Sequence, residues 1–454
     1  MEKKNPMGFK PVFPLLLSMA FPPMISMLIQ SLYNIVDSIF VAQLSEEALT
    51  AVSLIYPLQN LSLAVCCGIG IAMNALIARH LGANDDKQAS YVASQGMLMT
   101  VLHSLLFVIL GLFFIQPFVS MFTTSTTVID YGVQYGTIVI TLTFGSFIHI
   151  AIEKMFQATG NMIVPMFLQL IGAIVNIVLD PIMIFGYFGF PALGVSGAAI
   201  ATVIGQMTAC ILAILLFYKK SGHIHMSFKD MKKIDTHIFS KLYSIAIPSG
   251  TMLCLPSVLV SILNGLLAGI SQSAVAFFGI YFKLQSFVYM PSNGVIQGMR
   301  PIMSYNYGAK EEKRMNQTLK ASLISIFTIL TLGTLLFFIF SELILSLFSA
   351  TDQMLGIGVS GLRILSLSFI LSTVGILMSG VFESLGLGKQ SLIISLLRQF
   401  IIIVPLSFIL ISMIGINGVW LTFPLSEAIA SLYAFYSYRH IYLKKIIPNI
   451  KTAD

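Results

Sequence analysis

The segment GANDDK at residues 82–87 recurs as GAKEEK at residues 308–313, so two similar hydrophilic motifs are related by a numbering offset of 226. Other identical residues occur at the same offset. They are Ala20 and Pro22 with Ala246 and Pro248, Gln59 with Gln285, Gly68 with Gly294, Met73 with Met299, and Phe156 and Gly160 with Phe382 and Gly386. Farther along, GVSG at 194–197 pairs with GING at 415–418 at an offset of 221. The recurrence indicates an internal duplication.

Long apolar runs fill both copies. The 454 residues are 57% hydrophobic and only 9% charged, whereas about a quarter of a soluble domain is charged. Runs of this length cross a bilayer, and in lipid they must be helices because every backbone polar group needs an internal partner. We therefore expect an all-α polytopic membrane protein with twelve transmembrane helices. The predicted spans are 13–42, 52–79, 91–118, 135–157, 163–188, 196–218, 242–267, 274–305, 321–348, 359–385, 391–414 and 419–441.

The duplication predicts three parts. Residues 1–218 form an N-terminal six-helix lobe, residues 219–241 a basic linker and residues 242–454 a C-terminal six-helix lobe. Because six is an even number, the halves are parallel repeats, which predicts pseudo-symmetric bundles with a substrate cavity between them near the midplane.

Lysine and arginine occupy alternate loops. Lys3, Lys4, Lys10, the linker, Lys154 and Lys451 fall on one side of the predicted topology, and the opposite loops hold neither residue type. By the positive-inside rule, the linker and both termini are cytoplasmic. The net charge of +7 therefore reflects topology, and no nucleic acid partner is expected.

Polar residues inside the spans are concentrated in the first half. Asn34 and Asp37 share a face of the first span with Gln30, and Asn176 and Asp180 lie one helical turn apart in the fifth. Thr202 adds a hydroxyl in the sixth. Ionisable residues in a membrane are functional candidates, so we expect a carboxylate-centred site. The alternative is that both aspartates only make structural hydrogen bonds, or that Asp37 lies near a membrane surface.

The second half lacks these groups at the same offset. Asp37 becomes Leu263, Asp180 becomes Leu406 and Asn176 becomes Ile402. The site is therefore predicted to belong to the first half alone.

A second polar stripe lies in the fourth span. His149, Glu153 and Gln157 follow helical spacing and are candidates for the substrate cavity with Gln30, although the neighbouring Lys154 suggests nearby water. Met290 and Met299 could line an adaptable apolar wall of the cavity, or simply belong to the core. Lys283 and Glu427 are a possible buried ion pair.

Two consecutive prolines, Pro22 and Pro23, interrupt the first span. Proline removes a backbone hydrogen bond and kinks a helix, so this position is the predicted hinge of a gate; a static kink is the alternative.

These residues resemble the multidrug and toxic compound extrusion (MATE) family along the whole chain. The resemblance rests on Pro22, NIVDSIFVAQL around Asp37, the two hydrophilic motifs, FQATGN at 156–161, NIVLDP at 176–181 and GVSGAAIAT at 194–202. Asp37, Asn176, Asp180 and Thr202 resemble the cation-binding network of the DinF-like or MepA-like branch. The acidic residues of helices 7 and 10 that are typical of the NorM-like branch have no clear counterpart.

The resemblance implies a MATE fold in a bacterial or archaeal plasma membrane and a secondary active antiporter, not an enzyme. We expect it to export cationic or aromatic drugs, with a role in antibiotic resistance, in exchange for protons, sodium ions or both, which the sequence does not decide between. No cofactor is expected. The expected partners are small-molecule substrates and the lipid bilayer, and the protein is expected to be a monomer. The alternative is a flippase or exporter of a lipid-linked sugar or metabolite.

Overall fold

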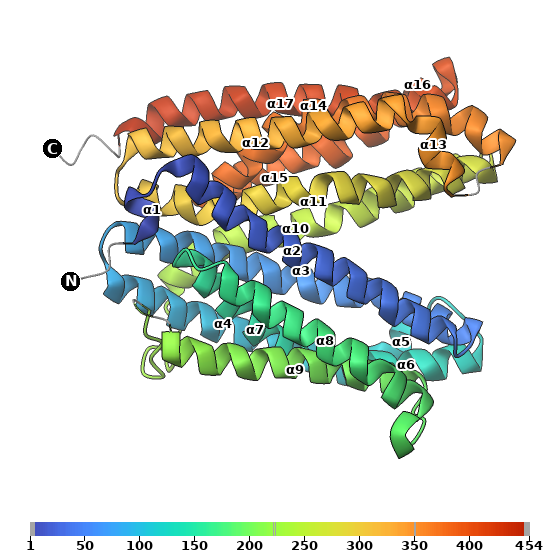
Figure 1. The fold of residues 1–454 in the computed structure, drawn as a ribbon, viewed down its shortest axis with the longest axis horizontal. Coiled ribbons are helices and arrows are strands. Elements are labelled where there is room, and N and C mark those ends of the chain that lie inside the picture. The colour runs from blue at the N-terminus through green and yellow to red at the C-terminus, as the bar shows by residue number, and fades with distance from the viewer. Residues whose placement is uncertain (1–4, 221, 223, 349–350, 449–454) are drawn as a thin grey trace. The chain divides into compact units, whose positions relative to one another are not determined.

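The computed structural model describes residues 5–220, 222, 224–348 and 351–448 (Figure 1). Over these residues the chain forms helices and no strand. Lys3, Lys4 and Lys451, which contribute to the predicted topology, lie outside the described residues.

The chain folds into two compact units. The first unit comprises Ile25–Gly250, and the second comprises Met1–Met24 together with Thr251–Asp454. This division differs from the predicted lobe boundaries at two points. The start of the first long helix belongs to the second unit, and the linker with the start of the seventh long helix belongs to the first unit.

The first unit contains the later part of α2 (Val12–Ala42) and the first part of α10 (Thr236–Ala268). Its apolar core includes Ile55, Phe107 and Phe147, all fully or almost fully buried. Its other helices are α3 (Glu46–Gly82), α4 (Asp86–Phe113), α5 (Ile115–Ser120), α6 (Thr126–Thr141), α7 (Phe144–Ala158), α8 (Ile163–Phe185), the short 3-10 helix η1 (Tyr187–Gly189) and α9 (Val195–Lys220).

The second unit contains the remaining parts of α2 and α10. Its core is aromatic, with Phe277 packed edge-on against Trp420 at a ring-centroid distance of 5.2 Å. Its other helices are α1 (Pro6–Phe9), α11 (Gln272–Gly308), α12 (Glu312–Ile339), α13 (Ser341–Ser346), α14 (Asp352–Ser384), α15 (Gly388–Leu396), the π-helix η2 (Leu397–Ile401), α16 (Ile403–Ile414), α17 (Ile416–Ile441) and the π-helix η3 (Tyr442–Ile446).

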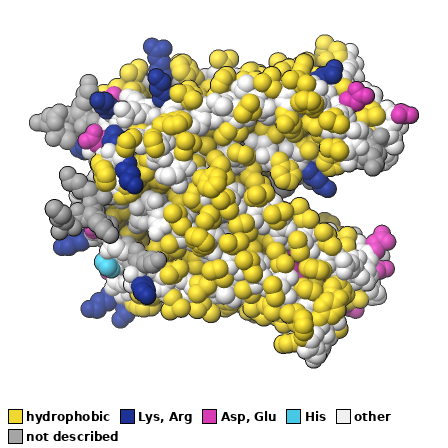
Figure 2. All heavy atoms as spheres, viewed as in Figure 1, with side chains coloured by type: hydrophobic (Ala, Val, Ile, Leu, Met, Phe, Trp, Pro, Cys, Tyr) yellow, Lys and Arg dark blue, Asp and Glu magenta, His cyan; other side chains and the backbone are white. Residues whose placement is uncertain are grey.

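The long helices confirm the prediction of an all-α polytopic membrane protein. Among the described residues, nine helices are long and apolar enough to span a membrane, and the α6–α7 pair, bent by 41°, makes a tenth. The more polar helices α11 and α17 cover the remaining two predicted spans. The face in Figure 2 is mainly hydrophobic, and most of its charged side chains lie toward the ends of the helices.

The helices α2 and α10 each pass from one unit to the other, and the segment that precedes each of them is hydrogen-bonded within the unit where that helix begins. In the second unit, Arg314 Nη2 donates to the carbonyl oxygens of Met7 and Lys10, at 2.9 and 2.8 Å. In the first unit, the buried Gln95 side chain of α4 donates to the carbonyl oxygen of Lys233 at 2.9 Å and accepts from the Asp235 N–H at 3.1 Å. Both segments are therefore hydrogen-bonded to a side chain of a long helix, Arg314 of α12 in the second unit and Gln95 of α4 in the first.

Candidate functional site

The close contact of α8 and α9 builds the centre of the site. At Gly205, a Cβ atom would lie only 2.6 Å from the carbonyl oxygen of Gly172, and at Gly197 it would lie 2.3 Å from that of Met183. These glycines let the two backbones approach more closely than any residue with a side chain would. The approach brings Thr202 of α9 against Asn176 of α8.

Three of the predicted residues form one buried hydrogen-bonded group. The Asn176 side-chain amide donates to Asp180 Oδ1 at 3.2 Å and to Thr202 Oγ1 at 3.4 Å. Asp180 is 0% exposed, and Asn176 and Thr202 are also buried. Asp180 Oδ2 and Asn176 Oδ1 are buried and have no hydrogen-bond partner in the described part of the chain. The group therefore has more acceptor oxygens than donors.

Asp37 belongs to the same site. It lies on the part of α2 that belongs to the first unit, and its carboxylate is close enough to Asp180 for the two charges to interact. Its Oδ1 atom is buried and also has no partner among the described residues. One turn earlier, Asn34 is exposed, so it lies at the edge of the site.

Two tyrosines that were missed by the sequence analysis border the carboxylates. Tyr33 and Tyr135 are each close enough to interact electrostatically with both Asp37 and Asp180. Tyr135 is buried, and its hydroxyl accepts a hydrogen bond from Gln59 at 3.4 Å. Tyr33 precedes Asp37 by one helical turn, so helical spacing could have indicated it. Tyr135 comes from α6, and no sequence signal connects it to the site.

The α7 stripe forms a separate buried network. Lys154 Nζ donates to Glu153 Oε1 and to Gln157 Oε1, both at 3.1 Å, and Gln157 Nε2 donates to Glu153 Oε1 at 2.8 Å. Lys154 is only 9% exposed, and its ammonium group is bound by these two side chains. His149 is also buried, and its Nε2 atom has no partner among the described residues.

The remaining candidates differ in environment. Gln30 and Met290 are partly exposed. Met299 is fully buried and faces Gly380, where a Cβ atom would lie 3.2 Å from its methyl carbon. Pro22 and Pro23 are buried in α2, which continues through them as one helix and leaves the second unit directly afterwards, at Met24.

The structure does not pair Lys283 with Glu427, which the sequence left as one possibility. Lys283 is exposed, and Glu427 instead forms an ion pair with Arg398 in the second unit. Arg300 is likewise paired, with Glu383 at 2.5 Å.

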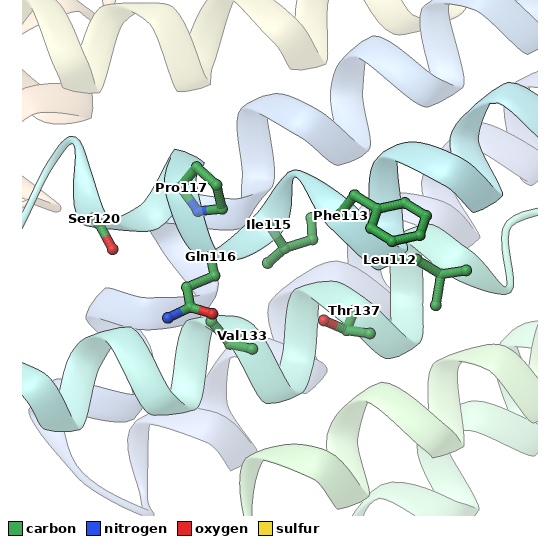
Figure 3. Close-up of a pocket in the computed structure, with 8 residues that line it drawn as sticks. All are labelled: Leu112, Phe113, Ile115, Gln116, Pro117, Ser120, Val133 and Thr137. Carbon is green, nitrogen blue, oxygen red and sulfur yellow. The ribbon is translucent and has the colours of Figure 1, made fainter.

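A surface hollow of about 460 Å³ lies at the junction of α4, α5 and α6 (Figure 3). Its lining is mixed, with Gln116 and Ser120 beside apolar residues. None of the candidate residues lines it.

Comparison with known proteins assigns the family. The family model described as MatE matches residues 22–182 and 248–409, two segments whose starts are related by the offset of the duplication. The multidrug export protein MepA of Staphylococcus haemolyticus (strain JCSC1435) is 27% identical over 94% of this chain and 93% of its own length. The FAD transporter of Shewanella oneidensis (strain ATCC 700550 / JCM 31522 / CIP 106686 / LMG 19005 / NCIMB 14063 / MR-1) is 26% identical over 96% of both chains. The crystal structure of MATE in complex with MaL6 shares the fold, with a TM-score of 0.90, 22% identity and complete coverage of both chains. The chain therefore belongs to the MatE family of multi-pass membrane transporters, the multidrug efflux (MATE) transporters.

Proposed function

We propose that this chain is a secondary active antiporter that exports cationic or aromatic compounds in exchange for protons, sodium ions or both. The observation that carries the proposal is the cluster of Asp37, Asp180, Asn176 and Thr202 in the first unit. Neither aspartate forms an ion pair with a lysine or arginine among the described residues, and each has a buried oxygen without a partner.

An uncompensated buried carboxylate is costly, and a second one nearby adds repulsion. A cation from solution relieves both costs. A proton neutralises one carboxylate directly. Sodium is a hard cation that prefers oxygen ligands, and Asp37, Asp180, Asn176 and Thr202 offer carboxylate, amide and hydroxyl oxygens. Both ions fit the chemistry of these residues, so either can serve as the coupling ion.

The proposed cycle links this site to α2. Cation binding from outside neutralises Asp37 and Asp180, α2 bends at Pro22 and Pro23, and the bound compound is expelled. Release of the cation to the cytoplasm restores the charged carboxylates and the affinity for the next substrate. A ligand can drive such a change only through different affinities for the two states, and the charge of the carboxylates supplies that difference.

The substrate class follows from the same side chains. Carboxylates and aromatic faces both attract cations, and Tyr33 and Tyr135 lie beside the two aspartates. As substrate-contacting residues we propose Gln30, His149, Glu153 and Gln157 in the first unit, and Met290 and Met299 in the second. The distribution of lysine and arginine supports a topology with both termini in the cytoplasm. We take the protein to be a monomer in a bacterial or archaeal plasma membrane.

A second candidate is the export of a metabolite. It is favoured by the relative named FAD transporter, which is 26% identical over 96% of the chain. A flippase for lipid-linked sugars is less well supported, because a pyrophosphate needs a cluster of cations, whereas the buried group of the first unit offers the carboxylates of Asp37 and Asp180.

The test is efflux of ethidium from proteoliposomes, driven in turn by a pH step and by a sodium step. Asp37→Asn and Asp180→Asn keep the size of the side chain and remove its charge, so each is expected to reduce ion-driven efflux to the level of empty liposomes. Asp130→Asn is the matched control, because Asp130 is exposed on α6 of the same unit. Undiminished ion-driven efflux in a folded Asp37→Asn variant would refute the coupling mechanism.

A further inference from the structure

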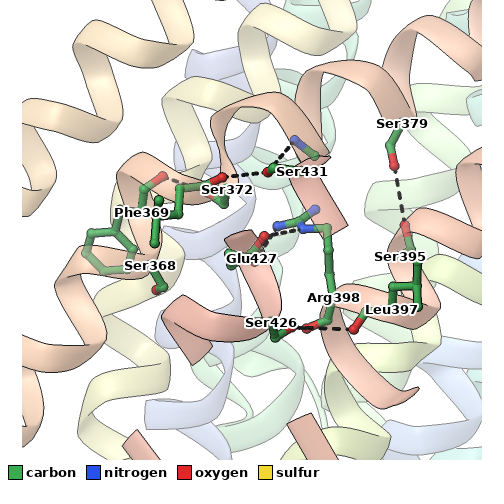
Figure 4. Close-up of polar contacts among 12 residues, drawn as sticks. Ser368, Phe369, Ser372, Ser379, Ser395, Leu397, Arg398, Ser426, Glu427 and Ser431 are labelled. Atoms are coloured by element: carbon green, nitrogen blue, oxygen red, sulfur yellow. Dashed lines mark hydrogen bonds and ion pairs between the residues drawn. The ribbon is translucent and has the colours of Figure 1, made fainter. Parts of the chain in front are cut away.

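A buried ion pair lies in the second unit, outside the site described above. Arg398 of the π-helix η2 donates from Nε to Glu427 Oε2 at 2.6 Å and from Nη2 to Glu427 Oε1 at 2.8 Å (Figure 4). Both residues are 8% exposed. Charged side chains within membrane helices are expensive and are usually functional, so this pair needs an explanation.

The pair lies between the helices that correspond to those of the first site. The duplication relates α9, which begins within GVSG, to α17, which begins within GING, and it relates α8 to the α15–η2–α16 segment. Each unit thus has a buried carboxylate in this pair of equivalent helices: Asp180 lies on α8, and Glu427 lies on α17, the counterpart of α9. Asp180 has no cationic side chain as a partner among the described residues, whereas Glu427 has Arg398. The second unit therefore carries its own cation and needs none from solution to neutralise this carboxylate.

The backbone is adapted to hold Arg398 in place. The helix is π-helical over Leu397–Ile401, and short π segments inside α-helices are frequent at functional sites. A π turn changes the backbone hydrogen bonds, and here the Ser426 hydroxyl donates to the carbonyl oxygens of Arg398 and Leu397, at 2.5 and 3.4 Å. Ser426 precedes Glu427, so one stretch of α17 binds both the backbone and the side chain of Arg398.

Space beside the guanidinium is kept by a glycine. At Gly375 of α14, a Cβ atom would lie 3.0 Å from Arg398 Cδ and 3.2 Å from its Nε. The Gly375 N–H donates to Ser431 Oγ at 3.2 Å, which fixes this part of α14 against α17. On the side of α11, Tyr289 is close enough to interact electrostatically with both charges and donates to Ser372 Oγ at 3.1 Å.

Arg398 retains hydrogen-bonding capacity. A guanidinium has five N–H donors. Within the described residues, the Arg398 side chain uses two of them, both in bonds to Glu427. Nη1 therefore has no partner there, and the side chain is not fully enclosed. A planar guanidinium with free donors matches the oxygens of a phosphate or a carboxylate.

We propose that Arg398 binds the phosphate or carboxylate group of a transported molecule, and that Glu427 competes with this group for the arginine. Glu427 compensates the arginine when no ligand is bound, and the ligand's oxygens take over some or all of its contacts. The proposal rests on the transport function, because the ligand is taken to be a transported molecule, and it adds anionic groups to the substrate class.

The experiment measures binding to the full-length protein in phosphatidylcholine nanodiscs, without any ion gradient. The probes are flavin mononucleotide and riboflavin, two fluorescent compounds that differ by one phosphate. The wild type is expected to bind flavin mononucleotide more tightly. Arg398→Lys keeps the charge but loses the planar pair of N–H donors that can bind two oxygens at once. It is expected to weaken flavin mononucleotide binding about tenfold or more and to leave riboflavin binding unchanged. Glu427→Gln removes the competing charge and is expected to strengthen flavin mononucleotide binding by a similar factor.

A purely structural ion pair predicts a different result. Glu427→Gln would then weaken the binding of both flavins or change neither, and either outcome overturns the proposal, as does equal binding of the two flavins by the wild type. Should Glu427→Gln fail to fold, the apolar double variant Arg398→Met/Glu427→Met leaves no buried charge, and it is expected to bind both flavins equally. A retained preference for flavin mononucleotide in that variant also overturns the proposal.

Two further comparisons distinguish a lipid from a transported molecule as the source of the anion, and distinguish this proposal from the coupling mechanism. In phosphatidylglycerol nanodiscs, competition that depends on Arg398 would show that a lipid phosphate can occupy the same arginine. Wild-type protein that shows no preference for flavin mononucleotide in phosphatidylcholine but an Arg398-dependent affinity for phosphatidylglycerol would assign the arginine to a lipid and overturn the proposal. Ion-driven efflux is measured apart from this binding assay. Wild-type protein that prefers flavin mononucleotide but shows no ion-driven efflux would refute the coupling mechanism alone, and absence of the preference with intact efflux would refute this proposal alone.

Discussion

Replacing Gly205 with alanine tests whether the contact of α8 and α9 holds the candidate site together. The added Cβ would lie 2.6 Å from the Gly172 carbonyl oxygen, and such contacts are almost never shorter than 3.0 Å. The obstacle is backbone, so the helices must separate by about 0.4 Å or more. Asn176 Nδ2 and Thr202 Oγ1 are already 3.4 Å apart, and the same separation takes them to about 3.8 Å, beyond hydrogen-bonding distance.

The expected result is a loss of both stability and ion coupling. Overpacking of this kind costs about 1–3 kcal/mol, which thermal unfolding in detergent would detect. Loss of Thr202 from the group should also raise the proton or sodium concentration needed for half-maximal efflux. Gly265→Ala is the matched control, because its Cβ meets no atom within 4 Å and alanine favours a helix. A Gly205→Ala variant with the ion dependence of the wild type would refute the role of this contact.

Two further predictions concern the packing of the first long helices of each half. Gln95→Leu removes the bonds that hold the linker, so amide hydrogen exchange over residues 224–235 should accelerate, whereas Gln88→Leu on the same helix should leave it unchanged. Gly68→Ala should lower the melting temperature more than Gly294→Ala. A Cβ atom at residue 68 would lie 2.4 Å from the backbone oxygen of Ala246, which cannot move easily. At residue 294 the nearest atom, at 2.3 Å, belongs to the Met24 side chain, which can move. Equal melting temperatures for the two variants would contradict this reasoning.

Much of the first site could be predicted because its signals are local or repeated. Asn176 and Asp180 are one turn apart, which places them on one face of a helix whatever its surroundings. Thr202 follows a glycine-rich motif that lets α9 approach α8. Asp37 was found as an intramembrane carboxylate, and its position beside Asp180 follows from packing between helices, which spacing along the chain does not encode.

The second site could not be predicted, because its partners come from different helices. Arg398 and Glu427 are far apart in sequence, and Lys283 was as plausible a partner for Glu427. Comparison of the halves at one fixed offset also concealed the pair. The offset falls from 226 to 221 before α17, and the π-helix at Leu397–Ile401 changes the register of the segment that carries Arg398.

The boundaries between the two units lie within α2 and α10 and not between helices, and this limits where the units can move relative to each other. The chain passes from the second unit to the first between Met24 and Ile25 of α2, and back between Gly250 and Thr251 of α10. These crossings are related by the same offset that defines the duplication, so both copies of the first helix are divided at the same place. Both crossings follow closely after a proline of the repeat, Pro22 in the first copy and its counterpart in the second. In the described part of the chain no other crossing occurs, so any relative movement of the units must be absorbed in α2 and α10, close to these prolines, where the helical hydrogen bonding is already interrupted.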